Sequence, residues 1–133
     1  MVTDMSRKFE LVQDPTPQQM NNSLITCANN ISRLQQLVAE YKANVGIKQT
    51  AYKRAMARAL VIHQHKKNAT LIKAMAELEP FVLNALDELD QATALYTVGQ
   101  GELEGYEAQF VALRKIVEIK KLEIQGRLDN YTT

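Results

Sequence analysis

The sequence predicts an all-α protein, a coiled-coil-like antiparallel hairpin or bundle of three long helices, or of four if the first breaks at Gly46. Three observations predict this fold. Apolar residues recur at alternating steps of three and four in three long stretches, which places them on one face of a helix with a 3.5-residue repeat. A threonine and a proline mark the start of the first stretch, and glycines separate the second stretch from the third.

We expect the first helix to run from residue 17 to about residue 66. Its apolar repeat consists of Met20, Leu24, Cys27, Ile31, Leu34, Val38, Tyr41 and Val45, followed by Tyr52, Ala55, Ala59 and Ile62, with Lys48 as the exception. Thr16 can cap the free amide groups, and Pro17 suits the first helical position because it has no N–H to lose. The repeat keeps its phase past Gly46, so a single helix is predicted, bent or interrupted at that glycine.

A second repeat follows a helix cap at Asn68 or Thr70. It consists of Met75, Leu78, Val82, Ala85, Leu89, Ala92 and Tyr96. Pro80 falls within this stretch, where it should kink the helix or mark a restart, because proline removes one backbone hydrogen bond and crowds the preceding turn.

Three glycines, Gly99, Gly101 and Gly105, then predict a short turn. A third repeat continues to about Leu128 and consists of Leu103, Tyr106, Phe110, Leu113, Val117 and Ile124. The second and third helices would be nearly equal in length. We therefore expect them to form an antiparallel hairpin with the longer first helix laid alongside.

Length and composition indicate one folded domain. The chain has 133 residues, of which 46% are apolar and 23% charged, as in ordinary globular proteins. We assign residues 16–133 to a single helical domain and residues 1–15 to an arm that is flexible or docked on a partner. The chain lacks the apolar segments of a secretory signal or a membrane span, so we expect a cytoplasmic protein without membrane association, in the host cell if a phage encodes it.

The charges are strongly segregated along the chain. Residues 42–73 carry eight lysines and arginines and no carboxylate, whereas residues 77–107 carry eight carboxylates and no lysine or arginine. The basic block either forms an open face that binds a polyanion such as single-stranded nucleic acid, or pairs with the acidic block. The candidate nucleic-acid-binding residues are Lys42, Lys48, Lys53, Arg54, Arg58, Lys66, Lys67 and Lys73, with Tyr52 placed to stack on a base. The sequence favours neither alternative.

No combination of residues predicts catalysis, a cofactor, a metal site or a small-molecule substrate. His63 and His65 are about 200° apart around a helix, so they cannot chelate one metal ion and are expected to extend the basic surface. Cys27 occupies the apolar repeat, which predicts a buried, inert thiol. The glycines at 99–105 lack the preceding strand of a dinucleotide-binding loop. We therefore expect a protein that is not an enzyme.

Self-association is expected for a geometric reason. A first helix of about fifty residues would overhang partners of fewer than thirty, so part of its apolar repeat would face water in a monomer. A homo-oligomer would cover it.

The chain resembles the phage recombination mediators of the UvsY type. The resemblance is carried by the cations Lys48, Lys53, Arg54 and Arg58 on the first long helix and by the apolar repeat from Phe110 to Ile124 at the end. It implies a non-enzymatic protein that forms closed rings, binds single-stranded DNA and helps a recombinase replace single-strand-binding protein. It also implies that the subunits are held together by Phe110, Leu113, Val117 and Ile124.

Two functions are consistent with these patterns. The first is an oligomeric helical protein that binds single-stranded nucleic acid through its basic helix, as a recombination mediator or accessory factor. The second is a structural, assembly or inhibitor protein of a phage or bacterium, which acts through helix-mediated contacts with another protein and without nucleic acid.

Overall fold

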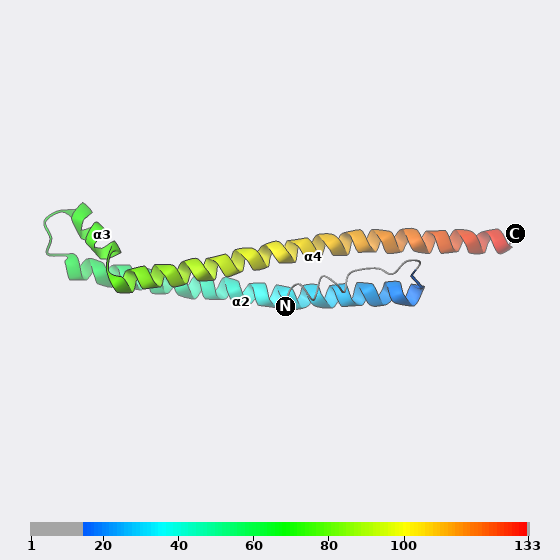
Figure 1. Ribbon diagram of the computed structural model, residues 1–133, viewed down its shortest axis with the longest axis horizontal. Coiled ribbons are helices and arrows are strands. Elements are labelled where there is room, and N and C mark those ends of the chain that lie inside the picture. Colours follow the sequence, from blue (N-terminus) through cyan, green and yellow to red (C-terminus); the bar gives the residue numbers. More distant parts are fainter. Residues whose placement is uncertain (1–14, 133) are drawn as a thin grey trace. The chain divides into compact units, whose positions relative to one another are not determined.

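The computed structural model describes the backbone of residues 15–132 and the side chains of residues 15–128. Over this range the chain forms helices α2 (Pro17–His63), α3 (Ala69–Glu77) and α4 (Pro80–Thr132), and no strand (Figure 1). The prediction of an all-α fold is therefore confirmed. Residues 1–14, which include most of the predicted arm, lie outside the described residues.

Helix α2 begins where the sequence predicts. Thr16 Oγ1 accepts a hydrogen bond of 3.1 Å from the backbone N–H of Gln19, and Gln19 Oε1 accepts one of 2.9 Å from the N–H of Thr16. This reciprocal pair is a capping box, with Pro17 in the first helical position. The helix continues through Gly46 without a break. The described chain therefore has three helices and not four.

Pro80 begins a new helix and does not kink a continuous one. Asn68 caps the short α3, because its Oδ1 accepts a 2.9 Å hydrogen bond from the N–H of Thr70. Helix α3 ends at Glu77, and α4 begins at Pro80. The prediction that Met75 and Leu78 belong to the buried repeat of the following helix is wrong, since both side chains are exposed.

The predicted glycine turn is also wrong, because α4 runs without interruption through Gly99, Gly101 and Gly105. The apolar repeat keeps its phase across them, as Ala92, Tyr96, Gly99, Leu103, Tyr106 and Phe110 alternate by four and three. Gly99 occupies a buried repeat position, where an added Cβ would lie 3.1 Å from the Tyr41 ring. A helical glycine is unfavourable by about 1 kcal/mol relative to alanine, which burial of the repeat can offset.

Because the turn is absent, the predicted hairpin between a second and a third helix does not form. Within each unit, a stretch of α2 is instead antiparallel to a stretch of α4. The expected overhang depended on two partner helices of fewer than thirty residues each, whereas the described chain has a single α4 of 53 residues in their place. Self-association therefore needs a different physical reason.

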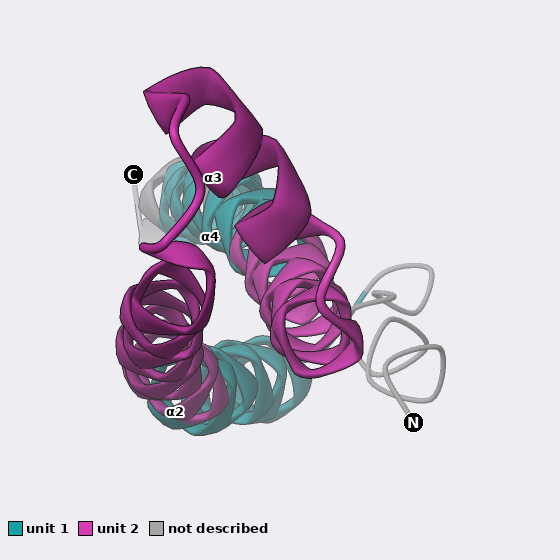
Figure 2. Ribbon diagram, turned by 90° about the vertical axis from the view of Figure 1, so that its left-hand side faces the viewer, with its two compact units in different colours: residues 1–36, 101–133 teal, residues 37–100 magenta. Residues whose placement is uncertain are grey.

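The contacts divide the chain into two compact units, which Figure 2 distinguishes by colour. Unit 1 contains residues 1–36 and 101–133, so that its described part is the first half of α2 antiparallel to the second half of α4 (Figure 1). Its core consists of Met20, Cys27, Leu113 and Val117, with Leu24, Ile31, Phe110 and Ile124 packed against them. These residues are the predicted repeats of the two segments.

Unit 2 contains residues 37–100, which comprise the second half of α2, all of α3 and the start of α4. Ala59, Ala76 and Val82 are buried together, one from each helix, and Tyr52, Ala55, Met56 and Phe81 pack against them. Ile62 ends the predicted repeat of α2 but is exposed. The small buried residues allow the three helices to approach closely, and they bring the basic block and the start of the acidic block into one unit.

Candidate nucleic-acid-binding face

The basic block lies entirely within unit 2. Five of its cations, Lys42, Lys48, Lys53, Arg54 and Arg58, lie on α2, Lys66 and Lys67 follow the end of that helix, and Lys73 lies on α3. Lys48 and Lys66 are half-buried, and the other six are exposed. The block is therefore displayed mainly on the outer surface of α2.

Among the described residues, the basic block forms one ion pair with the acidic block. Lys48 Nζ lies 3.3 Å from Glu88 Oε2, and both side chains remain substantially exposed to solvent. No described carboxylate forms an ion pair with Lys53, Arg54 or Arg58. Lys48 occupies the exceptional position of the apolar repeat, which explains why it reaches α4 while its neighbours face outward.

Arg58 is held over an aromatic ring. Its guanidinium carbon lies 4.8 Å from the centroid of the Phe81 ring, which is close enough for a cation–π interaction. Phe81 in turn packs against the core of unit 2. The contact restricts the rotation of a long side chain and leaves its positive charge without a described counterion.

An open, shallow depression of about 450 Å³ lies among these cations. It is lined by Ala43, Gly46, Ile47, Thr50, Ala51 and Arg54. By helical geometry, Lys42 and Lys53 lie on one side of this strip of α2, about 16 Å apart, and Arg58 lies on the other. The Thr50 hydroxyl donates a 3.1 Å hydrogen bond to the Gly46 carbonyl oxygen, so it is already satisfied. The depression thus has a mainly apolar floor and cations at its edges.

The small residues of this floor were missed by sequence reasoning. Gly46 was interpreted only as a break or hinge, whereas an added Cβ there would meet nothing within 4 Å. The signal that could have identified this floor is the recurrence of small residues on the side of α2 away from its apolar repeat, namely Ala43, Gly46, Thr50 and Ala51.

Two predicted members of the basic surface have other contacts. Tyr52 is half-buried against the core of unit 2, which leaves less of its ring for a base. His63 does not extend the basic surface, because its Nε2 lies 2.7 Å from Glu79 Oε1 and only 12% of its side chain is exposed. His65 is exposed in the segment after α2.

The residues assigned to oligomerisation by resemblance are engaged within the chain. Leu113 and Val117 are buried in the core of unit 1, and Phe110 and Ile124 pack against that core. Each of the four contributes to the pairing of α2 with α4. A contact between subunits through them would have to replace this packing.

Cys27 is buried in the core of unit 1, and burial raises the pKa of its thiol. Among the described residues, no three His, Cys, Asp or Glu side chains come together in a way that could hold a metal ion. None of the helices over the described range combines the length and apolar character needed to cross a membrane.

Comparison with known proteins identified no relative of this chain. No protein-family model, no curated protein and no solved structure matches the chain. A functional assignment therefore depends on the geometry and charge of the face described above.

Proposed function

We propose that this protein binds single-stranded nucleic acid, without sequence preference, through the outer face of α2 in unit 2. The observation that carries the proposal is the absence of ion pairs between Lys53, Arg54 or Arg58 and any described carboxylate. Cations that form no ion pair with the described carboxylates can contact phosphates, and binding is then driven by the release of counterions.

The depression between these cations favours a single strand. Four of its six lining residues, Ala43, Gly46, Ile47 and Ala51, are apolar, and such a surface can lie against sugars and the faces of unpaired bases. Arginine planes can stack on such bases as aromatic rings do. Arg54 is the one residue lining the depression whose charged donors could reach a base edge, since the Thr50 hydroxyl is already bonded to the Gly46 carbonyl. One such group reads little sequence, so the expected binding depends on charge and not on sequence.

The protein would act as a binding factor and not as an enzyme. Its resemblance to UvsY-type mediators extends the proposal to an accessory role in recombination, in the cytoplasm of a host cell if a phage encodes it. The basic helix would then hold the strand while other proteins act on it.

The test is a titration of a fluorescently labelled oligothymidine at several salt concentrations, followed by anisotropy. If three or four phosphates are contacted, the logarithm of the association constant should fall with the logarithm of the salt concentration with a slope of roughly −2 to −3. The double substitution Arg54→Glu/Arg58→Glu should remove binding while circular dichroism shows that the helices persist.

A matched control separates the proposed face from net charge. The double substitution Arg33→Glu/Lys121→Glu changes the net charge by the same amount at exposed positions of unit 1. It should retain most of the affinity. Failure of the unaltered protein to bind at low salt, or equal loss in both double variants, would contradict the proposal.

A further inference from the structure

Within unit 1, helix α4 carries apolar residues on two sides. Leu113 and Val117 face α2 and are buried, with 5% and 2% of their surfaces exposed. Ile116, Ile119 and Leu122 are instead 43%, 56% and 71% exposed. A surface helix normally has polar residues opposite its buried side, so this second apolar strip is not explained by the fold of the single chain.

The second strip lies on the outer side of α4. Ile119 is two residues beyond Val117, and therefore about 200° away around the helix. Ala112 and Gly126 continue the strip at its two ends, and both are exposed. An added Cβ at Gly126 would meet nothing within 4 Å. The strip thus has three large apolar residues in its middle and small residues at either end.

We propose that this strip, defined by Ile116, Ile119 and Leu122, is an interface between two copies of the chain, in which the two α4 helices pack antiparallel with Ile119 at the twofold axis. The proposal concerns a surface in unit 1 and does not depend on the nucleic-acid-binding face of unit 2.

The pattern of residues is self-complementary in this arrangement. Antiparallel pairing about Ile119 sets Ile116 level with Leu122 of the second copy, and Ala112 level with Gly126. A twofold interface requires such a relationship, because the same patch must fit itself. Small residues at both ends permit close approach of the two helices, while the large residues fill the middle.

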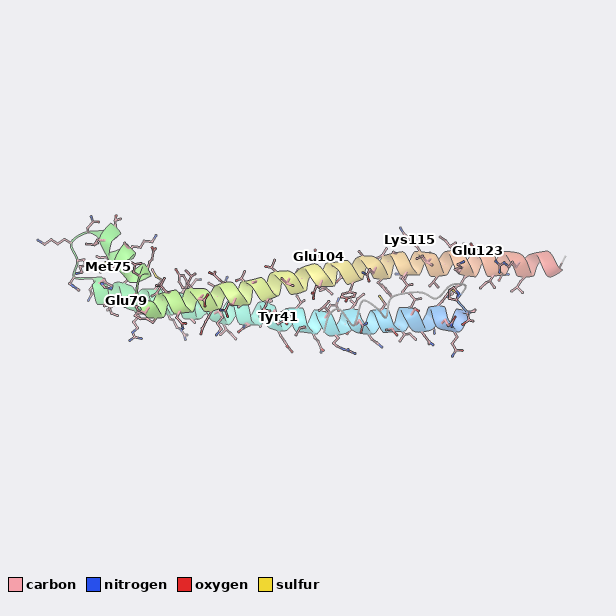
Figure 3. All side chains as sticks on the ribbon, in the orientation of Figure 1. Tyr41, Met75, Glu79, Glu104, Lys115 and Glu123 are labelled. Atoms are coloured by element: carbon pink, nitrogen blue, oxygen red, sulfur yellow. The ribbon has the colours of Figure 1, made fainter. Side chains whose placement is uncertain are left out.

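Charge selects the antiparallel direction. Lys115 and Glu123, which Figure 3 labels, lie four residues before and after Ile119, so they share the face of the strip at about 40° from Ile119, and both are exposed. Antiparallel pairing sets Lys115 level with Glu123 of the second copy, twice by symmetry, whereas parallel pairing sets lysine beside lysine. Within the chain, Glu123 Oε2 also lies 3.5 Å from Lys120 Nζ. That exposed pair is weak, and it leaves the second carboxylate oxygen for Lys115 of the other copy.

The size of the strip implies a modest affinity. Stable interfaces usually bury about 800 Å² on each partner, more than three large side chains on one helix provide. We therefore expect a dimer whose population depends on concentration. Sedimentation velocity of the full chain over a range of concentrations should show a reversible shift from monomer to dimer.

The substitution Ile119→Glu tests the interface directly. It places two like charges together at the axis. Because Ile119 is exposed, the substitution should leave the helices folded, which circular dichroism checks. We expect monomers at every concentration. Ile25→Glu is the matched control, because Ile25 is also an exposed isoleucine of unit 1 but lies on α2; it should leave the dimer intact.

Two further variants test the direction and the axis. Lys115→Glu and Glu123→Lys should each weaken the dimer about tenfold, and the two together should restore it by exchanging the partners of each pair. Ile119→Cys should form a disulfide between copies under mild oxidation, because a residue on the axis meets itself, while Cys27 is buried and does not compete.

The proposal is overturned if the unaltered chain is monomeric at all concentrations, if Ile119→Glu still dimerises, or if the charge exchange fails to restore association. A dimer that persists in Arg54→Glu/Arg58→Glu would show that this interface and the proposed nucleic-acid face are separate.

Discussion

His63 Nε2 lies 2.7 Å from Glu79 Oε1, which joins the last residue of α2 to the residue that precedes α4. Both side chains are mostly shielded from solvent, with 12% and 24% exposed. Glu79 is labelled at this junction in Figure 3. The contact is therefore placed to fix the end of α2 to the connection between α3 and α4, which no sequence pattern had linked.

Replacing His63 should destabilise unit 2. His63→Ala removes a partly buried hydrogen bond and leaves Glu79 without its partner, so we expect the free energy of unfolding to fall by about 1–2 kcal/mol. Urea denaturation followed by circular dichroism measures it. His65→Ala, at an exposed position two residues on, should change it by less than about 0.5 kcal/mol. Strict additivity of His63→Ala and Glu79→Ala would show that the two side chains do not interact.

Gly99 and Gly101 should respond oppositely to a larger side chain. An added Cβ at Gly99 would lie 3.1 Å from the Tyr41 ring and 3.3 Å from Val38 Cγ2, whereas one at Gly101 meets nothing within 4 Å. Gly101→Leu should raise the free energy of unfolding by up to about 1 kcal/mol through helix propensity. Gly99→Leu should lower it by about 1–3 kcal/mol through overpacking. Equal effects in urea denaturation would mean that Tyr41 does not pack on Gly99.

The contrast between these glycines explains what the sequence could and could not predict. The apolar repeats identified the buried faces of α2 and α4, because residues that alternate by steps of three and four fall on one face of a helix. The turn at 99–105 was predicted from glycine content alone, although the repeat passes through Gly99 in phase. Propensity was a weaker guide than the pattern of burial.

The candidate site was predictable in part for a similar reason. Segregation of charge identified the basic block, since like charges on one helix tend to face water. The sequence could not tell whether Lys53 and Arg54 pair with carboxylates, because that depends on the register between α2 and α4. The shallow depression had a signal in the sequence, the small residues on one side of α2, but a search for apolar repeats does not detect it.

Asn30 should be replaceable by an apolar residue with a gain in stability. It is the buried polar residue of the described range, with 3% of its surface exposed, and its Nδ2 has no hydrogen-bond partner. A buried donor without a partner is unfavourable by about 1–3 kcal/mol. Asn30→Leu keeps the branching of the side chain, and we expect the free energy of unfolding to rise by about 1 kcal/mol.

Asn29→Leu is the control, because Asn29 is exposed on the same helix and should have little effect on the same urea denaturation curve. A polar residue within a helical interface can fix the register of the two helices. If Asn30→Leu lowers the free energy of unfolding instead, the contacts of the Asn30 side chain stabilise the fold by more than its amide nitrogen without a partner destabilises it.

Stability should fall at alkaline pH, and Cys27 should contribute to the fall. Burial raises the pKa of its thiol above the ordinary value of 9.0. Above that pH the unfolded chain releases the thiol proton while the folded chain retains it, so the unfolded state binds fewer protons and the free energy of unfolding decreases as pH rises. The decrease begins near pH 9 and continues up to the pKa of the folded state. Below pH 8 the thiol has no effect on the pH dependence.

Urea denaturation under reducing conditions at pH 7, 8, 9 and 10 measures this slope, which can reach about 1.4 kcal/mol per pH unit for one proton. Cys27→Ala should lower stability at every pH because of the cavity, but its curve should be flatter than that of the unaltered protein between pH 8 and 10. Burial, and to a lesser extent Glu102, also raises the pKa of Tyr106, so both proteins should lose stability above pH 10. Parallel curves from pH 8 to 10 would mean that Cys27 ionises as readily in the folded chain as in the unfolded one.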